Sequence, residues 1–161
     1  MVSHTKNVSL APYNSFGIDL KAAHFIRFQN TNEIATIFCL PELQTITQNS
    51  ETILILGGGS NILLCNDIKG VVIKNEIQYI KILEETIQTA MVEVGAGVPW
   101  QDFVDYTINK QWGGIENLSL IPGSVGAAPI QNIGAYGIEV SSVIEKVNLY
   151  HIETNRFFSL N

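Results

Sequence analysis

Glycine is the residue through which this sequence most clearly suggests chemistry. All of its thirteen glycines except Gly17 lie between Gly57 and Gly137, and nine of these twelve fall in three clusters. A glycine has no Cβ, so the backbone N–H groups beside it can approach a ligand directly and bind an anion. Three such clusters in one small domain predict a long ligand that lies along exposed backbone.

The first cluster, Gly57 to Asn61 (GGGSN), directly follows an apolar, strand-like run. It lacks the lysine of a P-loop, and it leads into more apolar sequence rather than into the helix of a Rossmann fingerprint. A tight turn between strands is the alternative interpretation. Three successive glycines exceed what a turn needs, so we favour an anion-binding nest.

The second cluster, Gly95 to Trp100 (GAGVPW), places Gly-x-Gly just before the expected start of a helix. A helix N-terminus can bind a phosphate or a carbonyl oxygen. A turn that only joins a strand to the helix is at least as consistent with this pattern.

The third cluster lies in Ile121 to Glu139 (IPGSVGAAPIQNIGAYGIE), which has no charged residue before Glu139. Its amides and main-chain groups could hydrogen-bond a planar heterocycle, while its small residues let a ring lie flush. The alternative is an Ω-loop that packs on its own apolar residues.

Other patterns of catalysis or metal binding are weak. Ser60 and Ser124 lie outside any G-x-S-x-G motif, and the three histidines are scattered. No pair of Cys or His has the spacing of a metal site. Glu116 and Asp102 do not form a convincing carboxylate pair. We therefore predict no metal site and no activated nucleophile.

Composition limits the partners. Charged residues make up 15% of the 161 residues, against roughly 25% in average domains, so we expect surface that a ligand, a partner or further chain covers. The net charge of −6 gives no footprint for nucleic acid. No apolar run reaches the ~18 residues of a membrane span. Without a secretory signal, Cys39 and Cys65 are expected to be buried thiols in a reducing cytoplasm.

Strands and helices must position the clusters. A helix is predicted from the capping box of Asn30 and Glu33 until Pro41 ends or restarts it. A second helix is predicted from Pro99 to about Lys110, with an inner face of Trp100, Phe103, Val104 and Ile108. Residues 52–56 are predicted to form a strand that is buried on both faces. Further strands are predicted over 24–29, 71–74, 77–83, 89–97, 143–153 and 156–160.

Four motifs together resemble one known family. They are NSFGI (14–18), LILGGGSNIL (54–63), VGAGVPW (94–100) and GGIENLSLIPGSVGAAPIQNIGAYGIE (113–139). This set is similar to the UDP-N-acetylenolpyruvoylglucosamine reductases, flavoenzymes of bacterial peptidoglycan precursor synthesis, over nearly the whole chain from about Asn14. GGGSN alone would indicate only the wider vanillyl-alcohol-oxidase-like fold.

The resemblance implies an α+β fold of the vanillyl-alcohol-oxidase/PCMH type, in which FAD extends between two small lobes. Residues 1–19 would be an N-terminal lead, 20–70 the first lobe and 71–161 the second. Because the chain stops inside an expected hairpin, we expect the second lobe to be incomplete and the family's substrate domain to lie beyond Asn161.

The resemblance also assigns roles to residues. The FAD diphosphate would be bound by the backbone of Gly57, Gly58, Gly59, Ser60 and Asn61. The segment beside the flavin would be Pro122, Gly123, Ser124, Gly126, Ala127 and Ala128. The isoalloxazine ring, ribityl chain and nearby sugar would meet Gln131, Asn132, Ile133, Gly134, Ala135, Tyr136 and Gly137. Within that group, the substrate-binding residues would be Asn132 and Tyr136.

In the family, hydride passes from NADPH to the flavin and then to the enolpyruvyl group of a nucleotide sugar, while an enzyme acid donates a proton. That acid would lie beyond Asn161, so we expect no catalytic residue here and no activity of this chain alone. Two alternatives stay open. One is an inactive FAD- or nucleotide-binding remnant. The other is an FAD-dependent oxidase, although GGGSN lacks the usual His or Cys for covalent flavin.

Overall fold

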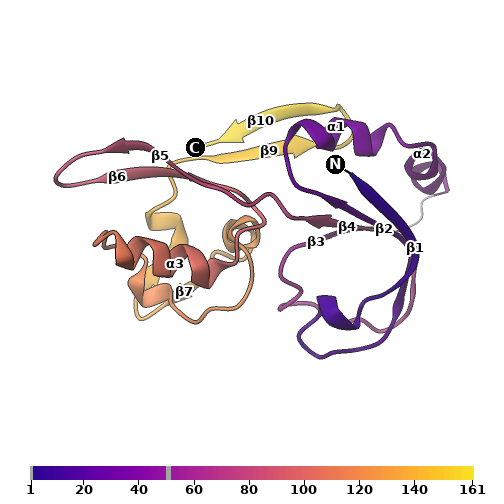
Figure 1. Ribbon diagram of the computed structural model, residues 1–161, viewed down its shortest axis with the longest axis horizontal. Helices are drawn as coiled ribbons and strands as arrows, with labels where there is room; N and C mark the ends of the chain where they lie inside the picture. The colour runs from indigo at the N-terminus through magenta and orange to yellow at the C-terminus, as the bar shows by residue number, and fades with distance from the viewer. Residues whose placement is uncertain (1, 50–51) are drawn as a thin grey trace.

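The computed structural model describes residues 2–49 and 52–161, and it has two parts (Figure 1). The first, which we call the sheet lobe, comprises the described residues up to 75 and contains a four-stranded sheet and two helices. The second, which we call the ribbon lobe, comprises residues 76–161 and contains two-stranded ribbons, helices and glycine-rich loops. This mixture of helices and strands confirms the predicted α+β class.

The sheet lobe is built on the strand order β1-β2-β4-β3. Its strands are β1 (Ser3–Ser9), β2 (Lys21–Phe28), β3 (Ile53–Leu56) and β4 (Ile68–Asn75). β1 is antiparallel to β2, whereas β2, β4 and β3 are parallel with β4 in the middle. The carboxyl ends of the three parallel strands therefore lie together along one side of the sheet, which we call the carboxyl edge. Open sheets of this kind bind ligands there.

Alternate side chains of β4 enter two separate cores. Val71 and Ile73 pack with helices α1 (Asn32–Phe38) and α2 (Pro41–Gln48) on one face of the sheet. Val72 enters a second core on the opposite face, which loops cover. Because successive side chains of a strand point to opposite faces, β4 is buried from both sides.

The prediction of burial on both faces is wrong for the strand at 52–56. Ile55 of β3 is 51% exposed, because β3 lies at the edge of the sheet. The strand that carries four successive buried residues is β4, over 70–73. A short apolar run thus predicted a strand correctly but not its place in the sheet.

The start of α1 differs from the predicted capping box. Thr31 is the N-cap and makes no side-chain capping bond. Glu33 does reach back, because its Oε2 accepts from the backbone N–H of Gln29 at 3.0 Å. Pro41 restarts a helix as one alternative predicted, since it is the first residue of α2.

The ribbon lobe consists of short paired strands and helices. Its strands are β5 (Ile80–Glu85), β6 (Ala90–Val94), β7 (Gly134–Ala135), β8 (Ile138–Glu139), β9 (Val147–His151) and β10 (Arg156–Leu160). They pair in sequence as three antiparallel ribbons. The helices are α3 (Trp100–Asn109) and α4 (Ala128–Gln131). Single 3₁₀ turns occur at Ala11–Tyr13, Glu116–Leu118, Val125–Ala127 and Val140–Ser142.

The two lobes touch outside the glycine loops as well. The β9–β10 ribbon extends across the molecule toward α1 (Figure 1). There the ring of Tyr150 stacks on Phe38 with a centroid distance of 5.7 Å.

Helix α3 shows the limit of a periodicity argument. Trp100 and Val104 are buried as predicted, but Ile108 is 49% exposed and Thr107 is buried instead. Thr107 tolerates burial because its hydroxyl donates to the carbonyl of Val104 at 2.8 Å. Ile108 lies beside the end of the helix, outside the core of the ribbon lobe.

Three further outcomes concern the sequence predictions. All predicted strands exist, and all but the last have shifted ends. The short strands β7 and β8 are additional, as is β1, which lies within the residues treated as a lead. Cys39 and Cys65 are free thiols but are exposed, so the expectation of burial is wrong; neither belongs to the apolar cores.

Among the described residues, no helix is both long and apolar enough to cross a membrane.

Candidate functional site

The first glycine cluster lies directly after β3, at the carboxyl edge of the parallel strands. Gly59 has a φ of +71°, and a Cβ there would lie 1.9 Å from the carbonyl oxygen of Tyr13. Gly58 lies against the third cluster, since a Cβ on it would be 2.9 Å from Cα of Gly123. The backbones of the two lobes therefore approach each other at glycines, where side chains would hold them apart.

The amides of this loop are available to a ligand. Across the described part of the chain, no acceptor is hydrogen-bonded to the backbone N–H groups of residues 57–61. Two carbonyls of the loop are used, because Gly59 accepts from the N–H of Ser15 at 3.1 Å and Gly57 accepts from Lys74 Nζ. Adjacent free N–H groups form a concave anion site, so the loop fits a phosphate.

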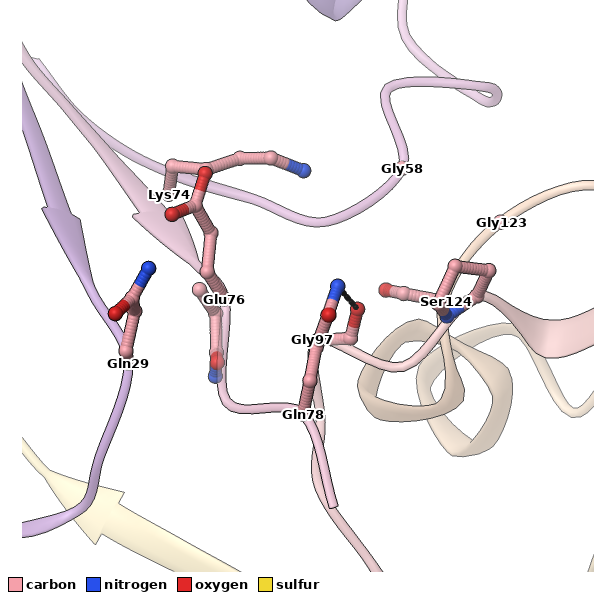
Figure 2. Close-up of a pocket in the computed structure, with 10 residues that line it drawn as sticks. Gln29, Gly58, Lys74, Glu76, Gln78, Gly97, Gly123 and Ser124 are labelled. Carbon is pink, nitrogen blue, oxygen red and sulfur yellow. Dashed lines mark hydrogen bonds between the residues drawn. The ribbon is translucent and has the colours of Figure 1, made fainter. Parts of the chain in front are cut away.

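A polar cavity of about 280 Å³ opens beside this loop (Figure 2). It is lined by Gln29, Gly58, Lys74, Asn75, Glu76, Gln78, Gly97, Pro99, Gly123 and Ser124. This volume lies just below the ~300 to 1,000 Å³ of typical ligand pockets, so the cavity would receive one portion of an extended ligand. Both lobes contribute to it.

Sequence reasoning missed the polar side chains of this cavity, which are Lys74, Gln29, Asn75, Glu76 and Gln78. Lys74 is the charged one that lies beside the first cluster. It follows Ile73 at the carboxyl end of β4 and pairs in register with Leu56 of β3 and Arg27 of β2. Figure 2 shows its side chain extending toward the Gly58 loop. Burial lowers the pKa of its ammonium, although the charge of Glu76 opposes that shift. A lysine that ends the apolar run VVIK was the only signal in the sequence.

The second cluster favours the turn interpretation. The N–H groups of Gly95 and Gly97 donate to the carbonyls of Tyr79 and Ile77 at 2.9 and 2.8 Å, so they are already used. The first N–H of α3, that of Trp100, likewise donates to a carbonyl of the third cluster at 3.0 Å. The cluster still contributes a wall of the cavity, where Gln78 Nε2 donates to the carbonyl of Gly97 at 3.4 Å.

The third cluster divides between the cavity and the core. Gly123 and Ser124 line the cavity, and Ser124 is also buried. Ala128 belongs to the core of the ribbon lobe, and Ile133 and Ala135 pack against it. The side chains of Ala128, Ile133 and Ala135 therefore pack in or against the core of the ribbon lobe and stabilise the loop.

The amides of the third cluster have protein partners. Asn61 Nδ2 donates to Gln131 Oε1 at 3.0 Å, which joins the first cluster to the third. Asn132 adopts the left-handed conformation, and its side chain binds Glu139 Oε2 at 2.8 Å and the N–H of Ser141 at 3.2 Å. Asn132 thus holds the turn around β7 and β8.

Tyr136 differs from its neighbours because its side chain is 89% exposed. Its φ of 52° and the following Gly137 form the tip of the β7–β8 hairpin. The predicted site residues that line the cavity are Gly58, Gly123 and Ser124. The others that do not line it are Gly57, Gly59, Ser60, Asn61, Pro122, Gly126, Ala127, Ala128, Gln131, Asn132, Ile133, Gly134, Ala135, Tyr136 and Gly137.

Acidic groups elsewhere have structural roles. Glu116 accepts from the N–H of Gly114 at 2.5 Å, and backbone hydrogen bonds lower its pKa.

The histidines of the sheet lobe lie outside the cavity. His4 Nε2 and His24 Nδ1 lie 2.9 Å apart between β1 and β2. Within residues 2–49 and 52–161, no group of three or more His, Cys, Asp or Glu could hold a metal ion.

Comparison with known proteins agrees with this geometry. The family described as FAD binding domain matches residues 22–151. The chain therefore belongs to the FAD-binding domain family.

Its relatives are more specific. It is 42% identical over 145 residues to the UDP-N-acetylenolpyruvoylglucosamine reductase of Bacteroides fragilis, a match that covers 90% of this chain and 42% of that protein. It is 43% identical over 152 residues to the enzyme of that name from Neisseria gonorrhoeae, covering 94% and 42%. The chain thus spans less than half the length of these relatives. The predicted resemblance to this reductase family is confirmed.

A solved structure supports the fold. The crystal structure of UDP-N-acetylenolpyruvylglucosamine reductase from Thermus caldophilus matches 99% of this chain and 52% of that chain, with a TM-score of 0.70 and 23% identity. At this identity the likeness concerns the fold alone, and it confirms the predicted α+β fold.

Proposed function

We propose that this chain is the FAD-binding part of a UDP-N-acetylenolpyruvoylglucosamine reductase. The reaction is the NADPH-dependent reduction of the enolpyruvyl group of UDP-N-acetylglucosamine enolpyruvate to give UDP-N-acetylmuramate. The observation that carries the proposal is the row of uncommitted N–H groups over residues 57–61, beside a polar cavity at the junction of the two lobes.

The residues of the chain would bind and orient FAD. The N–H groups of the first cluster would receive the diphosphate, as the free amides favour. The Asn61–Gln131 bond would hold the first and third clusters at a constant separation. When bound, FAD supplies the two-electron carrier between NADPH and the substrate. Exposed Tyr136 would contact the nucleotide sugar, and Asn132 would act through the shape of its turn.

The biological setting follows from the reaction. A reductase of nucleotide-linked precursors works in the cytoplasm, and its product serves peptidoglycan synthesis. Loss of the activity would impair cell wall biogenesis, and with it cell shape, cell division and the cell cycle. No nucleic acid or membrane partner is part of this proposal.

The first test is FAD binding. The purified protein should bind FAD, seen as flavin absorbance after reconstitution and as a saturable change in flavin fluorescence. Gly58→Val should weaken binding more than about a hundredfold, because it displaces a loop that offers several hydrogen bonds to charged oxygens, each worth roughly 1.5 to 3 kcal/mol. A wild-type protein that stays colourless and cannot be reconstituted with FAD would contradict the proposal.

Gly113→Ala is the control for that variant, at a glycine with open space around it. A Cβ at Gly113 would meet no atom closer than the carboxylate of Glu116 at 3.9 Å. We expect FAD affinity within about twofold of wild type, as for surface substitutions of small energetic effect. An equal loss in both glycine variants would show that the first cluster has no special role.

The second test is turnover. We expect the 161 residues to bind FAD but not to oxidise NADPH in the presence of UDP-N-acetylglucosamine enolpyruvate, because the chain spans less than half the length of the related reductases and we place the proton-donating acid in the part it does not span. A coupled loss of NADPH absorbance and formation of UDP-N-acetylmuramate by this chain alone would show that the acid lies within it.

A further inference from the structure

We propose that Lys74 binds the diphosphate of FAD and supplies the positive charge that the glycine loop lacks. This inference rests on the proposed FAD binding and adds a residue to that site. Neither the glycine motifs nor the match to the family singles out this lysine.

The position of Lys74 follows from strand register. Lys74 pairs with Leu56, the last residue of β3, and the glycine loop begins at the next residue of that strand. The lysine therefore lies at the carboxyl edge beside the loop, and its Nζ donates to the carbonyl of Gly57. The free N–H groups over 57–61 belong to the same loop. An anion held by those groups would lie within reach of this ammonium.

Charge is scarce at this site. Among the described residues that line the cavity, Lys74 is the one cation and Glu76 the one carboxylate. Glu76 Oε1 lies 3.9 Å from Nη1 of Arg27 on β2. The whole chain carries a net charge of −6, which repels a doubly charged ligand. A diphosphate therefore gains from a local cation more than it would in a basic protein.

The surroundings of Lys74 also favour an anionic partner. Its side chain is half-buried in the cavity wall, so its ammonium has lost part of its water. A backbone carbonyl compensates only partly for that loss, whereas a phosphate oxygen forms a stronger, charge-assisted hydrogen bond. The flexible stem lets Nζ contact a phosphate placed next to the loop.

The competing interpretation is a support role. Lys74 could act only by holding the Gly57 carbonyl and thereby the shape of the loop. If Lys74 only supports the loop, FAD affinity depends on the shape of the lysine side chain and falls in the arginine variant too. If Lys74 acts through its charge, FAD affinity survives replacement by arginine. It then also depends on salt concentration, and a neutral variant loses that dependence.

The experiment measures the FAD dissociation constant by flavin fluorescence at two salt concentrations. The variants are Lys74→Met, Lys74→Arg and the control Lys69→Met. Lys69 is an exposed lysine on the same strand, five residues nearer its start and outside the cavity. We expect Lys74→Met to weaken FAD binding by about tenfold to a hundredfold and to remove most of the salt dependence. Lys74→Arg should stay within about fivefold of wild type, and Lys69→Met within twofold.

A measurement on the wild-type protein keeps the test independent of variant folding. Lysines are acetylated with and without saturating FAD and quantified by mass spectrometry. We expect FAD to protect Lys74 and not Lys69.

The outcomes separate this inference from the proposed function. Failure of the wild-type protein to bind FAD would overturn the proposed function. Normal FAD binding with equal affinities of Lys74→Met and Lys69→Met would overturn the role of Lys74 alone. Equal weakening by Lys74→Met and Lys74→Arg with an unchanged salt dependence would also overturn it, in favour of loop support. Undiminished acetylation of Lys74 in the FAD complex would also overturn the proposed contact between Lys74 and the diphosphate.

Discussion

The sheet lobe and the ribbon lobe bury their strands to different extents. In the sheet lobe, β4 has four successive buried residues, because strands flank it and cores cover both faces. In the ribbon lobe, every residue of β10 is exposed, including Phe157, Phe158 and Leu160. Both strands contain apolar residues, but β4 lies between β2 and β3 whereas β10 pairs only with β9, so the neighbours of a strand decide how far it is buried.

The comparison explains where the candidate site lies. A two-stranded ribbon cannot bury both faces, so its stability depends on what packs against it. The core of the ribbon lobe therefore forms under α3, around Trp100 and Val104. The cavity lies where loops that leave the rigid sheet meet loops that this second core supports.

The largest expected effect is a truncation in the sheet lobe. Ile26 is fully buried, so Ile26→Ala should lower the free energy of unfolding by about 2 to 5 kcal/mol through lost burial and a residual cavity. The measurement is chemical denaturation followed by circular dichroism. Ile87→Ala is the control, since Ile87 is fully exposed, and it should change stability by less than about 0.5 kcal/mol. Equal effects would contradict the burial contrast.

The next effect tests the core of the ribbon lobe. Trp100 Nε1 donates to the carbonyl of Leu118 at 2.8 Å in a buried setting. Trp100→Phe leaves that carbonyl unpaired and should cost about 1 to 3 kcal/mol. Trp112 bonds the exposed carboxylate of Glu85 at 3.2 Å, so Trp112→Phe should cost under about 0.5 kcal/mol. A larger loss of stability in Trp112→Phe than in Trp100→Phe would show that the core of the ribbon lobe does not lie around Trp100.

A smaller effect is expected on the exposed ribbon. Phe157 of β10 is 56% exposed and its ring packs on Tyr150 at a centroid distance of 5.0 Å. Phe157→Ser should change the free energy of unfolding by less than about 1 kcal/mol and should raise solubility, measured by light scattering. A loss as large as that of Ile26→Ala would show that β10 is part of a cooperative core.

The smallest effect is a pH dependence in the ribbon lobe. Burial, followed by the hydrogen bond and charge of Glu93, raises the pKa of Tyr79 to about 12. Because this folded-state value exceeds the unfolded value of about 10, the folded state binds more protons between them. The contribution of Tyr79 is therefore present below pH ~10 and is lost as pH rises toward 12. Tyr79→Phe should show a flatter decline of stability in thermal unfolding over that range, and an identical decline would contradict the shift.

Much of the fold could be predicted because it depends on local pattern. Alternating and continuous apolar runs located every predicted strand, and Pro41 and Pro99 located helix starts. The polar residues of β1 gave no such pattern, since β1 gains its place by pairing with β2. The exposure of Ile55 and Ile108 depends on what lies beside them, which no local window contains.

The candidate site divides in the same way. Three glycine clusters were visible because a backbone that must approach another backbone excludes side chains locally, as at Gly58 and Gly59. Which N–H groups stay free was not visible, and the second cluster uses its own in strand-like pairing.

The sequence by itself determined the α+β class, the glycine loops and the family, because each depends on residue types at short spacing. Only the tertiary structure decided which residues share the cavity. Register placed Lys74 beside the end of β3, and close packing of two glycine loops joined lobes that are distant in sequence. Contacts of this kind depend on long-range strand pairing and burial. Lys74, near the end of β4, therefore meets the glycine loop after β3 only when the sheet has formed.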